Sequence, residues 1–176
     1  MSSGTPRHLV VMGVSGVGKT TIAEAVAGRL GWELAEGDDF HSAANRAKMS
    51  AGLPLTDADR LPWLRALVAW TAARRRAGRP TVLTCSALKR RYRDILRQGG
   101  DGEGTAFVHL VADRGLLLQR MRGREHFMPA DLLQSQLDDL EPLQHDEPGV
   151  VVDAALTPER IVAKVVAELG LRVTGR

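Results

Sequence analysis

A glycine-rich segment near the start of the chain has the residue types and spacing that bind a polyphosphate. The segment reads Gly13-Val14-Ser15-Gly16-Val17-Gly18-Lys19-Thr20 and matches G-x-x-x-x-G-K-[ST], the pattern of the phosphate-binding P-loop. In such a loop Lys19 reaches the outer phosphates of ATP, and the Thr20 hydroxyl ligates Mg²⁺. We therefore expect the whole segment, together with the following Thr21, to bind ATP and Mg²⁺.

The residues around this segment predict the local structure that a P-loop requires. The apolar run 9–12 precedes it and is typical of a buried strand, and residues 21–27 have the pattern of a helix. A strand that turns through glycines into a helix directs backbone N–H groups and the positive helix end toward one point. A chance Gly-rich turn is the alternative, and this context disfavours it.

A second group of chemically active residues follows the next expected strand. Glu36, Asp38 and Asp39 place carboxylates beside a phosphate site, where they would repel ATP unless a cation or a proton-transfer role offsets them. Mg²⁺ provides that offset, and an Asp facing a substrate hydroxyl can orient it or accept its proton. The alternative is that Asp38 and Asp39 only cap the helix expected from about Ser42.

The elements that must position these residues alternate along the chain. We predict strands near 8–12, 32–36, 80–85, 106–111 and 149–153. We predict helices near 19–30, 42–51, 60–77, 88–98, 114–122, 130–140 and 158–169. This order predicts an α/β fold in three layers, with a five-stranded parallel sheet and helices on both faces. Ligands should then bind at the carboxyl edge of the sheet.

The segment 120–131 has the features of a lid over such a site. It joins two expected helices, carries Gly and Pro as hinge candidates, and presents Arg120, Arg122 and Arg124. Closure would exclude water and bring an Arg to the transferring phosphoryl group. We expect Arg120 to bind nucleotide and Arg124 to be catalytic, although a solvated basic helix end is the alternative. By contrast, Gly99–Gly104 is expected to be a flexible surface loop.

Composition limits the class of protein. The chain has 176 residues and 44% hydrophobic content, which predicts one domain spanning 1–176 with a real core. No apolar run is long enough to cross a membrane, and the first eight residues lack the apolar region of a signal peptide, so we expect a cytoplasmic protein. Cys85, the single cysteine, is expected to be a buried thiol.

The charge pattern suits an anionic partner. The net charge is only +3, but basic residues cluster in 74–76, 89–93 and 120–124. A nucleic-acid-binding protein could use such clusters, yet the chain has few aromatic residues for stacking and no long basic tail. We therefore expect a small anionic substrate and no nucleic acid.

The middle of the chain resembles a known family. Residues 37–64 contain G-D-x-x-H-x-x-x-N-x-x-K-M-x-x-G-x-P-L-x-D-x-D-R-x-P-W-L, and this segment looks like the substrate-binding segment of bacterial-type gluconokinases. Residues 85–97 and 124–142 also resemble that family, so the likeness extends from about residue 8 to 169. These small P-loop kinases are related in fold to shikimate and adenylate kinases, so the resemblance implies a fold of the nucleoside-monophosphate-kinase type for this chain.

The resemblance implies transfer of the γ-phosphate of ATP to the 6-hydroxyl of D-gluconate by a homodimer. By analogy with shikimate kinases, Asp38 would face the attacking hydroxyl and Glu36 would approach Mg²⁺. A carboxylate suits an Arg fork or a Lys. The resemblance implies Arg60 as its partner, because Arg60 matches the Arg of the motif D-R-x-P-W-L. A polyol needs hydrogen-bonding partners. The substrate-binding residues expected on these grounds are Asp38, His41, Lys48, Arg60, Ser86, Lys89, Arg90 and Gln136.

Three other functions fit parts of the sequence. The first is another small-metabolite P-loop kinase, such as one acting on shikimate. The second is a binding module that uses ATP as a switch. The third, an inactive scaffold, is disfavoured by the intact Lys19, Thr20 and Asp38.

Overall fold

All five expected strands form in the computed structural model, which describes residues 4–123 and 130–175. The strands are β1 (His8–Met12), β2 (Glu33–Glu36), β3 (Thr81–Thr84), β4 (Thr105–Val111) and β5 (Gly149–Asp153). They pair in parallel in the order β2-β3-β1-β4-β5. The predicted α/β architecture with a five-stranded parallel sheet is therefore confirmed.

The seven expected helices are also present, with shifts of a few residues at their ends. They are α1 (Lys19–Leu30), α2 (Ala43–Ser50), α3 (Asp57–Arg76), α4 (Arg90–Arg97), α5 (Arg114–Arg122), α6 (Ala130–Asp139) and α7 (Pro158–Glu168). Two short 3₁₀ helices, η1 (Gly37–Phe40) and η2 (Gln98–Gly100), were not predicted. Helix α3 begins three residues earlier than expected because Thr56 and Asp59 form a reciprocal capping box.

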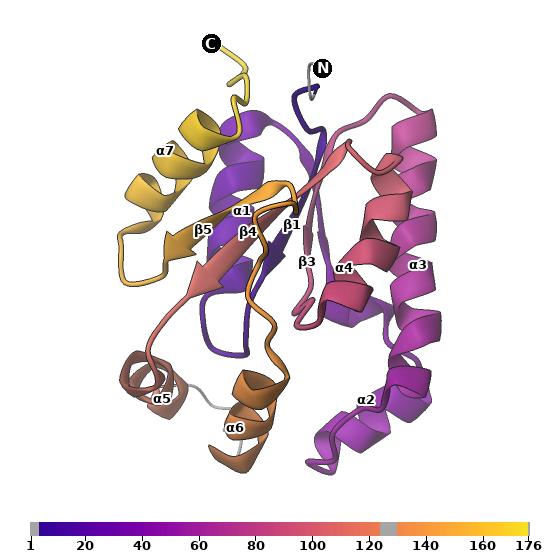
Figure 1. Ribbon diagram of the computed structural model, residues 1–176, viewed down its shortest axis with the longest axis vertical. Helices are drawn as coiled ribbons and strands as arrows, with labels where there is room; N and C mark the ends of the chain where they lie inside the picture. The colour runs from indigo at the N-terminus through magenta and orange to yellow at the C-terminus, as the bar shows by residue number, and fades with distance from the viewer. Residues whose placement is uncertain (1–3, 124–129, 176) are drawn as a thin grey trace.

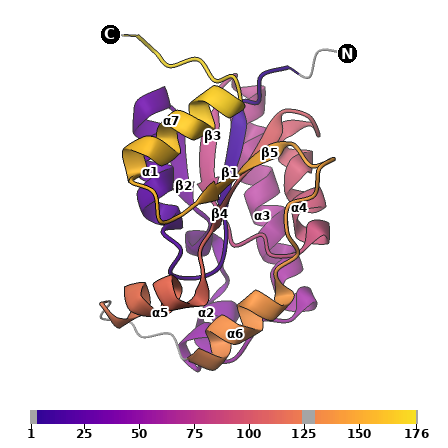
Figure 2. The same cartoon turned by 60° about the vertical axis from the view of Figure 1, so that its left-hand side comes forward.

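The helices form a layer on each face of the sheet. Figure 1 shows α1 and α7 on one face and α3 and α4 on the other, and Figure 2 shows the same layers from a second direction. Helices α2, α5 and α6 gather at the end of the molecule opposite the two termini, beyond the carboxyl ends of the strands. These three helices therefore lie at the edge of the sheet where the sequence predicted ligand binding.

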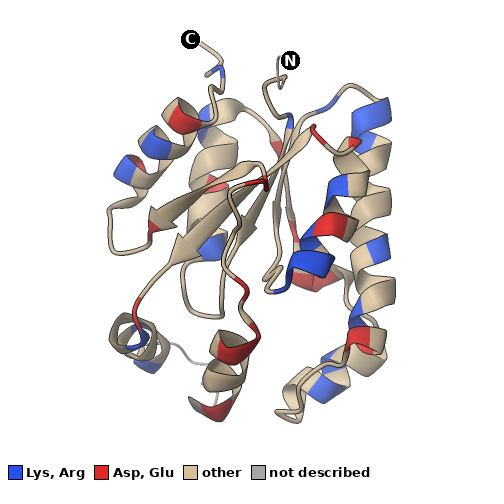
Figure 3. Cartoon of the chain, in the orientation of Figure 1, with Lys and Arg blue, Asp and Glu red and all other residues tan. Residues whose placement is uncertain are grey.

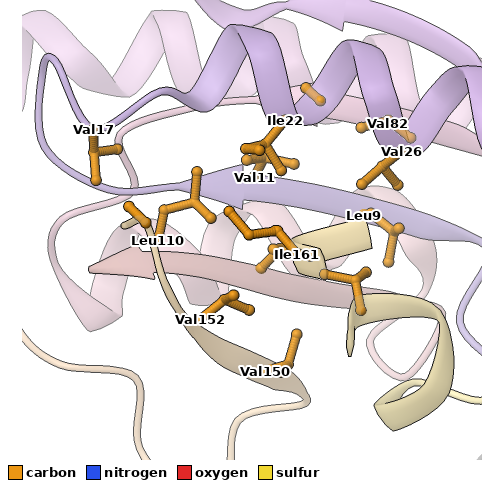
Figure 4. Close-up of a cluster of buried hydrophobic side chains, with 14 of the residues drawn as sticks. Leu9, Val11, Val17, Ile22, Val26, Val82, Leu110, Val150, Val152 and Ile161 are labelled. Atoms are coloured by element: carbon orange, nitrogen blue, oxygen red, sulfur yellow. The ribbon is translucent and has the colours of Figure 1, made fainter. Parts of the chain in front are cut away.

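Two apolar clusters fix the layers, one on each face of the sheet. Leu9 and Val11 of β1 point to the α1/α7 side, where they pack with Val26 and Ile161 (Figure 4). Their neighbours on β1 belong to the other cluster, with α3 and α4. Because β1 is buried on both faces, it has an uninterrupted apolar sequence, and it holds the P-loop rigidly at its carboxyl end.

The glycine-rich segment 99–104 is packed more tightly than the sequence suggested. Gly99 and Gly100 are buried, and a Cβ at Gly99 would lie 2.8 Å from Cβ of Thr71 on α3. The expectation of a flexible surface loop is therefore wrong for these two residues. The cause is a tertiary contact: glycine lets the backbone approach α3 closely.

A fully buried ion pair ties α4 to the segment before β5. Arg93 donates from Nε to Glu147 Oε1 at 2.6 Å and from Nη2 to Oε2 at 2.9 Å, and neither side chain is exposed. Arg93 Nη1 also donates to the carbonyl oxygens of Ala87 and Glu141, both at 3.0 Å. The sequence placed Arg93 within a basic cluster and gave no sign of this structural role.

Removing one partner of this pair should destabilise the fold strongly. We expect Glu147→Gln to lower the free energy of unfolding by about 3–5 kcal/mol, because it leaves the Arg93 charge buried and unbalanced. Asp94→Asn is the matched control, since it breaks the exposed Arg90–Asp94 pair and should cost less than about 1 kcal/mol. Urea unfolding measures both; equal small losses would show that the buried pair contributes little.

Two buried histidines should make the fold sensitive to mild acid. Burial lowers the pKa of His8 and of His109 to about 4, and neighbouring Arg side chains add to the effect. Between pH 6.5 and 4 the unfolded chain therefore binds more protons than the folded one, and stability falls as the pH falls. Each histidine contributes a slope of at most about 1.4 kcal/mol per pH unit.

His109 allows this to be tested, because neither of its ring nitrogens has a hydrogen-bond partner among the described residues. We expect His109→Leu to fold at neutral pH and to flatten the dependence of unfolding free energy on pH between 6.5 and 4. Urea titrations at half-unit pH steps measure the slope; an unchanged slope would mean that His109 is not a source of the acid sensitivity.

The basic clusters do not lie together. Figure 3 shows Lys and Arg distributed over several helices, and the ends of α3 and α5 and the start of α4 each carry one group. In the part of the chain that the structure describes, no helix is long and apolar enough to cross a membrane.

Candidate active site

A cavity of about 340 Å³ opens at the carboxyl edge of the sheet, where the sequence predicted ligand binding. Its walls come from the P-loop, from the residues after β2 and β3, from the α2–α3 connection and from α6. Eleven of the expected site residues line it: Ser15, Gly16, Gly18, Lys19, Thr20, Glu36, Asp38, His41, Arg60, Ser86 and Gln136.

The P-loop forms the nucleotide side of the cavity. Gly18 caps α1 with φ 105°, a left-handed conformation that favours glycine, and no side chain caps the helix. The first N–H groups of α1 are therefore not satisfied by a side-chain cap, as an anion site requires. Lys19 Nζ donates to the carbonyl oxygens of Gly13 at 3.0 Å and Val14 at 3.1 Å, so it lies across the loop.

The other P-loop residues serve as framework. The side chains of Val14 and Val17 are buried in the core, and the Gly13 N–H donates to the Ser86 carbonyl at 3.2 Å. Ser86 therefore contributes to the site through its backbone, as well as lining the cavity. Thr21 lies in the first turn of α1 but does not line the cavity.

Glu36 is held at the cavity by the neighbouring strand. Thr84 Oγ1 donates to Glu36 Oε2 at 2.6 Å and accepts from the Gly37 N–H at 3.0 Å. A Cβ on Gly37 would lie 2.0 Å from the Thr84 carbonyl oxygen, so only glycine fits there. The other carboxylate oxygen, Oε1, is buried without a hydrogen-bond partner among the described residues. A buried carboxylate oxygen with unused acceptor capacity suits a hydrated Mg²⁺.

Asp38 presents its carboxylate to the cavity from η1. Its side chain is 78% exposed, and Oδ1 lies 3.8 Å from Nε2 of His41. Asp38 and Asp39 do not cap α2, because Ser42 does so by accepting from the Asn45 N–H at 3.1 Å. The capping alternative is therefore wrong, and Asp38 is available for chemistry.

His41 is a buried, neutral donor or acceptor beside Asp38. Its ring stacks on Trp63 with centroids 4.2 Å apart, and Asn45 Nδ2 lies 3.3 Å from its Nδ1. An amide that donates to Nδ1 leaves the proton on Nε2, which faces Asp38. Burial lowers the pKa of His41, an effect that the Asp38 carboxylate opposes.

Arg60 lies on the wall formed by α3. Its Nη1 donates to the Tyr92 hydroxyl at 3.0 Å, and its Cζ lies 5.4 Å from the centroid of the Tyr92 ring. Its positive charge contributes to lowering the pKa of His41. The structure thus brings Arg60 to the cavity through a contact with α4.

Four other predicted residues lie outside the cavity. Lys48 donates to Asp59 at 2.7 Å, and Lys89 lies between Asp57 at 3.8 Å and Asp139 at 3.9 Å. Arg90 binds Asp146 through both Nη atoms, at 2.8 and 2.9 Å. Arg120 donates to the carbonyl oxygens of Val17 at 2.8 Å and Ala154 at 2.7 Å, and so braces the P-loop from behind. The reason is the same throughout: acidic side chains or backbone carbonyls hold these cations where they lie.

Gln136 lines the cavity and contacts the P-loop. Its Oε1 accepts from the Ser15 N–H at 2.7 Å, and its Nε2 donates to Ser15 Oγ at 3.1 Å. These bonds tie α6 to the P-loop, and the expected contact of Gln136 with the acceptor substrate stays a prediction. Of the predicted lid, residues 124–129, including Arg124, lie outside the described residues.

Sequence reasoning missed several cavity residues. Trp63 is buried, but it also lines the cavity, and its Nε1 donates to the Gly37 carbonyl at 2.7 Å. Cys85 is buried as expected, and burial raises its pKa to about 12, yet it too lines the cavity. The remaining missed residues are Met49, Leu53, Pro54, Leu55, Thr84, Leu132, Ser135 and Asp139. Except for the acidic Asp139, their apolar or uncharged polar types carried no chemical signal.

Comparison with known proteins finds relatives that match along most of the chain. The profile of the AAA domain family matches residues 9–143. A gluconokinase from Gluconobacter oxydans (strain 621H) is 51% identical over 162 residues, covering 92% of this chain and 90% of that protein. A gluconokinase structure from Sinorhizobium meliloti 1021 has a TM-score of 0.86 at 46% identity, covering 94% of this chain and 93% of that one. A shikimate kinase from Bacteroides thetaiotaomicron, with a TM-score of 0.68 at 16% identity over 93% of this chain and 98% of that one, shares the fold alone.

Proposed function

The chain belongs to the gluconokinase family, and we propose from this premise how its residues phosphorylate D-gluconate. The reaction transfers the γ-phosphate of ATP to the 6-hydroxyl, giving 6-phospho-D-gluconate and ADP. The observation that carries the proposal is one cavity whose walls are the P-loop, Asp38 and Arg60. It offers a phosphate cradle, a carboxylate for the hydroxyl and a cation for the substrate's acid group.

The acceptor is oriented from both ends. The Arg60 guanidinium binds the carboxylate of D-gluconate, which places the far end of the polyol near the P-loop. Asp38 accepts a hydrogen bond from the 6-hydroxyl and takes its proton as the bond to phosphorus forms. His41 binds a hydroxyl of the polyol, since its neutral ring can donate from Nε2.

Charge neutralisation supplies the rest of the catalysis. Lys19 and the N–H groups at the start of α1 stabilise the negative charge on the transferring phosphoryl group. Thr20 would ligate Mg²⁺ directly, and Glu36 would hold its water shell through Oε1, the oxygen without a protein partner among the described residues. The bound ion would supply further neutralisation of the phosphate charge. In the lid, about 120–131, Arg124 adds a further cation at closure.

The homodimeric state and the role of segment 37–64 as the substrate-binding part come from the family resemblance. The single-domain organisation and the cytoplasmic location come from the length and composition of the chain. A shikimate-type acceptor and an ATP-switched binding module are not favoured, because relatives of such high identity are gluconokinases.

A coupled ADP-release assay with Mg²⁺-ATP tests the function directly. The acceptors are D-gluconate, other aldonates, shikimate and nucleoside monophosphates. We expect strong turnover with D-gluconate and little with the other classes. Turnover confined to shikimate or a nucleotide would overturn the substrate assignment, and a folded protein that binds ATP but phosphorylates nothing would favour the binding module.

A further inference from the structure

Arg60, the cation expected to bind the acid group of the substrate, is held by an uncharged tyrosine hydroxyl. Arg60 donates to the Tyr92 hydroxyl at 3.0 Å, and none of the ion pairs within 4–123 and 130–175 includes Arg60. Most other basic residues near the cavity, such as Lys48, are paired with a carboxylate. No carboxylate among the described residues therefore competes with a ligand for the Arg60 guanidinium.

The Tyr92 hydroxyl is oriented by a carboxylate on its other side. It donates to Asp57 Oδ1, and Arg91 donates to Asp57 Oδ2. A phenol has one proton to donate, so donation to Asp57 leaves its oxygen lone pairs for Arg60. These hydrogen bonds and the nearby cations lower the pKa of Asp57, with the bond from Tyr92 as the largest cause, so this carboxylate stays ionised. The Tyr92 hydroxyl thus donates its proton to Asp57 and accepts a hydrogen bond from Arg60.

The Tyr92 hydroxyl separates an acidic and a basic side chain of the same helix, Asp57 and Arg60. Asp57 and Arg60 are three residues apart in the first turn of α3, a spacing at which an acid and a base on a helix normally pair directly. Instead the Tyr92 hydroxyl bonds to both and lies between them. Its ring is buried, which prevents the hydroxyl from swinging away. Without that oxygen, Arg60 would pair with Asp57 and leave the cavity.

We propose that Tyr92 is a positioning residue that sets the enzyme's preference for an acid substrate. By lying between Asp57 and Arg60, its hydroxyl keeps the Arg60 guanidinium directed into the cavity, where it meets a carboxylate. The inference rests on the proposed function only in taking that carboxylate to be the acid group of D-gluconate. It predicts that Tyr92 acts on recognition of the acid and not on phosphoryl transfer.

D-gluconamide, in which a neutral amide replaces the carboxylate, separates these effects. In Tyr92→Phe we expect the KM for D-gluconate to rise about tenfold, the loss of one hydrogen bond to a charged group. The kcat, the KM for ATP and the KM for D-gluconamide should stay unchanged. Asp57→Asn in the Tyr92→Phe protein should restore part of the affinity, because a neutral amide attracts the Arg60 guanidinium much less than a carboxylate does. A Tyr92→Phe protein that loses kcat instead, or is not rescued by Asp57→Asn, contradicts the proposal.

Arg60→Ala separates a failure of this inference from a failure of the proposed function. If Arg60→Ala still prefers D-gluconate to D-gluconamide, the carboxylate site itself is wrong. If Arg60→Ala loses that preference but Tyr92→Phe keeps it, the site stands and the role of Tyr92 is wrong. We expect both variants to lose it, with no further loss when they are combined.

A spectroscopic measurement tests the contact without activity. Tyr92 is the single tyrosine of the chain, so protein labelled with ¹³Cζ-tyrosine gives one tyrosine signal. D-Gluconate should shift that signal, whereas D-gluconamide should not, and the shift should vanish in Arg60→Ala. No shift with saturating D-gluconate would overturn the link between Tyr92 and the substrate.

Discussion

Lys19→Ala should reduce kcat by about 10²- to 10³-fold, the typical loss when one preorganised charge-stabilising group is removed from an active site. Lys19 lies across the P-loop and lines the cavity, so its ammonium group can neutralise the phosphoryl group as it transfers. The fold should persist, because the loop is anchored independently by buried Val14 and Val17. Steady-state kinetics with D-gluconate, together with thermal unfolding, measure both effects.

The matched control is Lys164→Ala. Lys164 lies on α7, which packs on the sheet face away from α3 and α4, and pairs with Glu168 at 3.7 Å. We expect wild-type kinetics from that variant. Near-normal turnover in a folded Lys19→Ala protein would refute the P-loop mechanism.

Asp38→Asn should lower kcat by about 10²-fold or more while leaving the affinity for ATP nearly unchanged. The substitution keeps the size and hydrogen-bonding reach of the side chain but removes its capacity to take a proton, which is worth about 10²- to 10⁴-fold. The Asp38 side chain is exposed to the cavity and caps neither η1 nor α2, so the variant should fold normally. Initial rates at saturating substrates give kcat, and calorimetry with a non-hydrolysable ATP analogue gives nucleotide affinity.

Asp39→Asn tests whether the position, and not the local negative charge, matters. Asp39 is the next residue in η1, is exposed and does not line the cavity. It should retain full turnover. If Asp38→Asn weakens ATP binding and leaves kcat intact, Asp38 belongs with Glu36 on the metal side of the site.

Much of the fold followed from local patterns. The strand before Gly13 and the helix from Lys19 can each be recognised from a stretch of no more than about fifteen residues. The same holds for the later strands and helices. Such periodicities act through the backbone and its immediate neighbours, so sequence alone contains them. The exact first and last residues of the helices were harder to predict. Helix α3, for example, begins where Thr56 and Asp59 cap it, and the sequence offers several residues that could cap a helix there.

The roles of charged residues could not be read in this way. Lys48, Arg60, Lys89 and Arg90 are all basic residues in segments that resemble the family, yet of these four only Arg60 lines the cavity. The difference lies in partners that are distant in sequence: Arg90 is held by Asp146, 56 residues away. An exposed flexible cation points where its nearest anion lies, and only folding brings that anion near.

By itself, the sequence determined the P-loop, the order of strands and helices, the edge at which ligands bind, and Asp38 as the candidate base. The tertiary structure decided which cations stay unpaired by carboxylates, that Gln136 contacts Ser15, and that Arg93 and Glu147 form a buried pair. It also placed Tyr92 between Asp57 and Arg60. The physical reason is that backbone patterns are fixed by neighbours in the chain, whereas charge pairing and burial are fixed by neighbours in space.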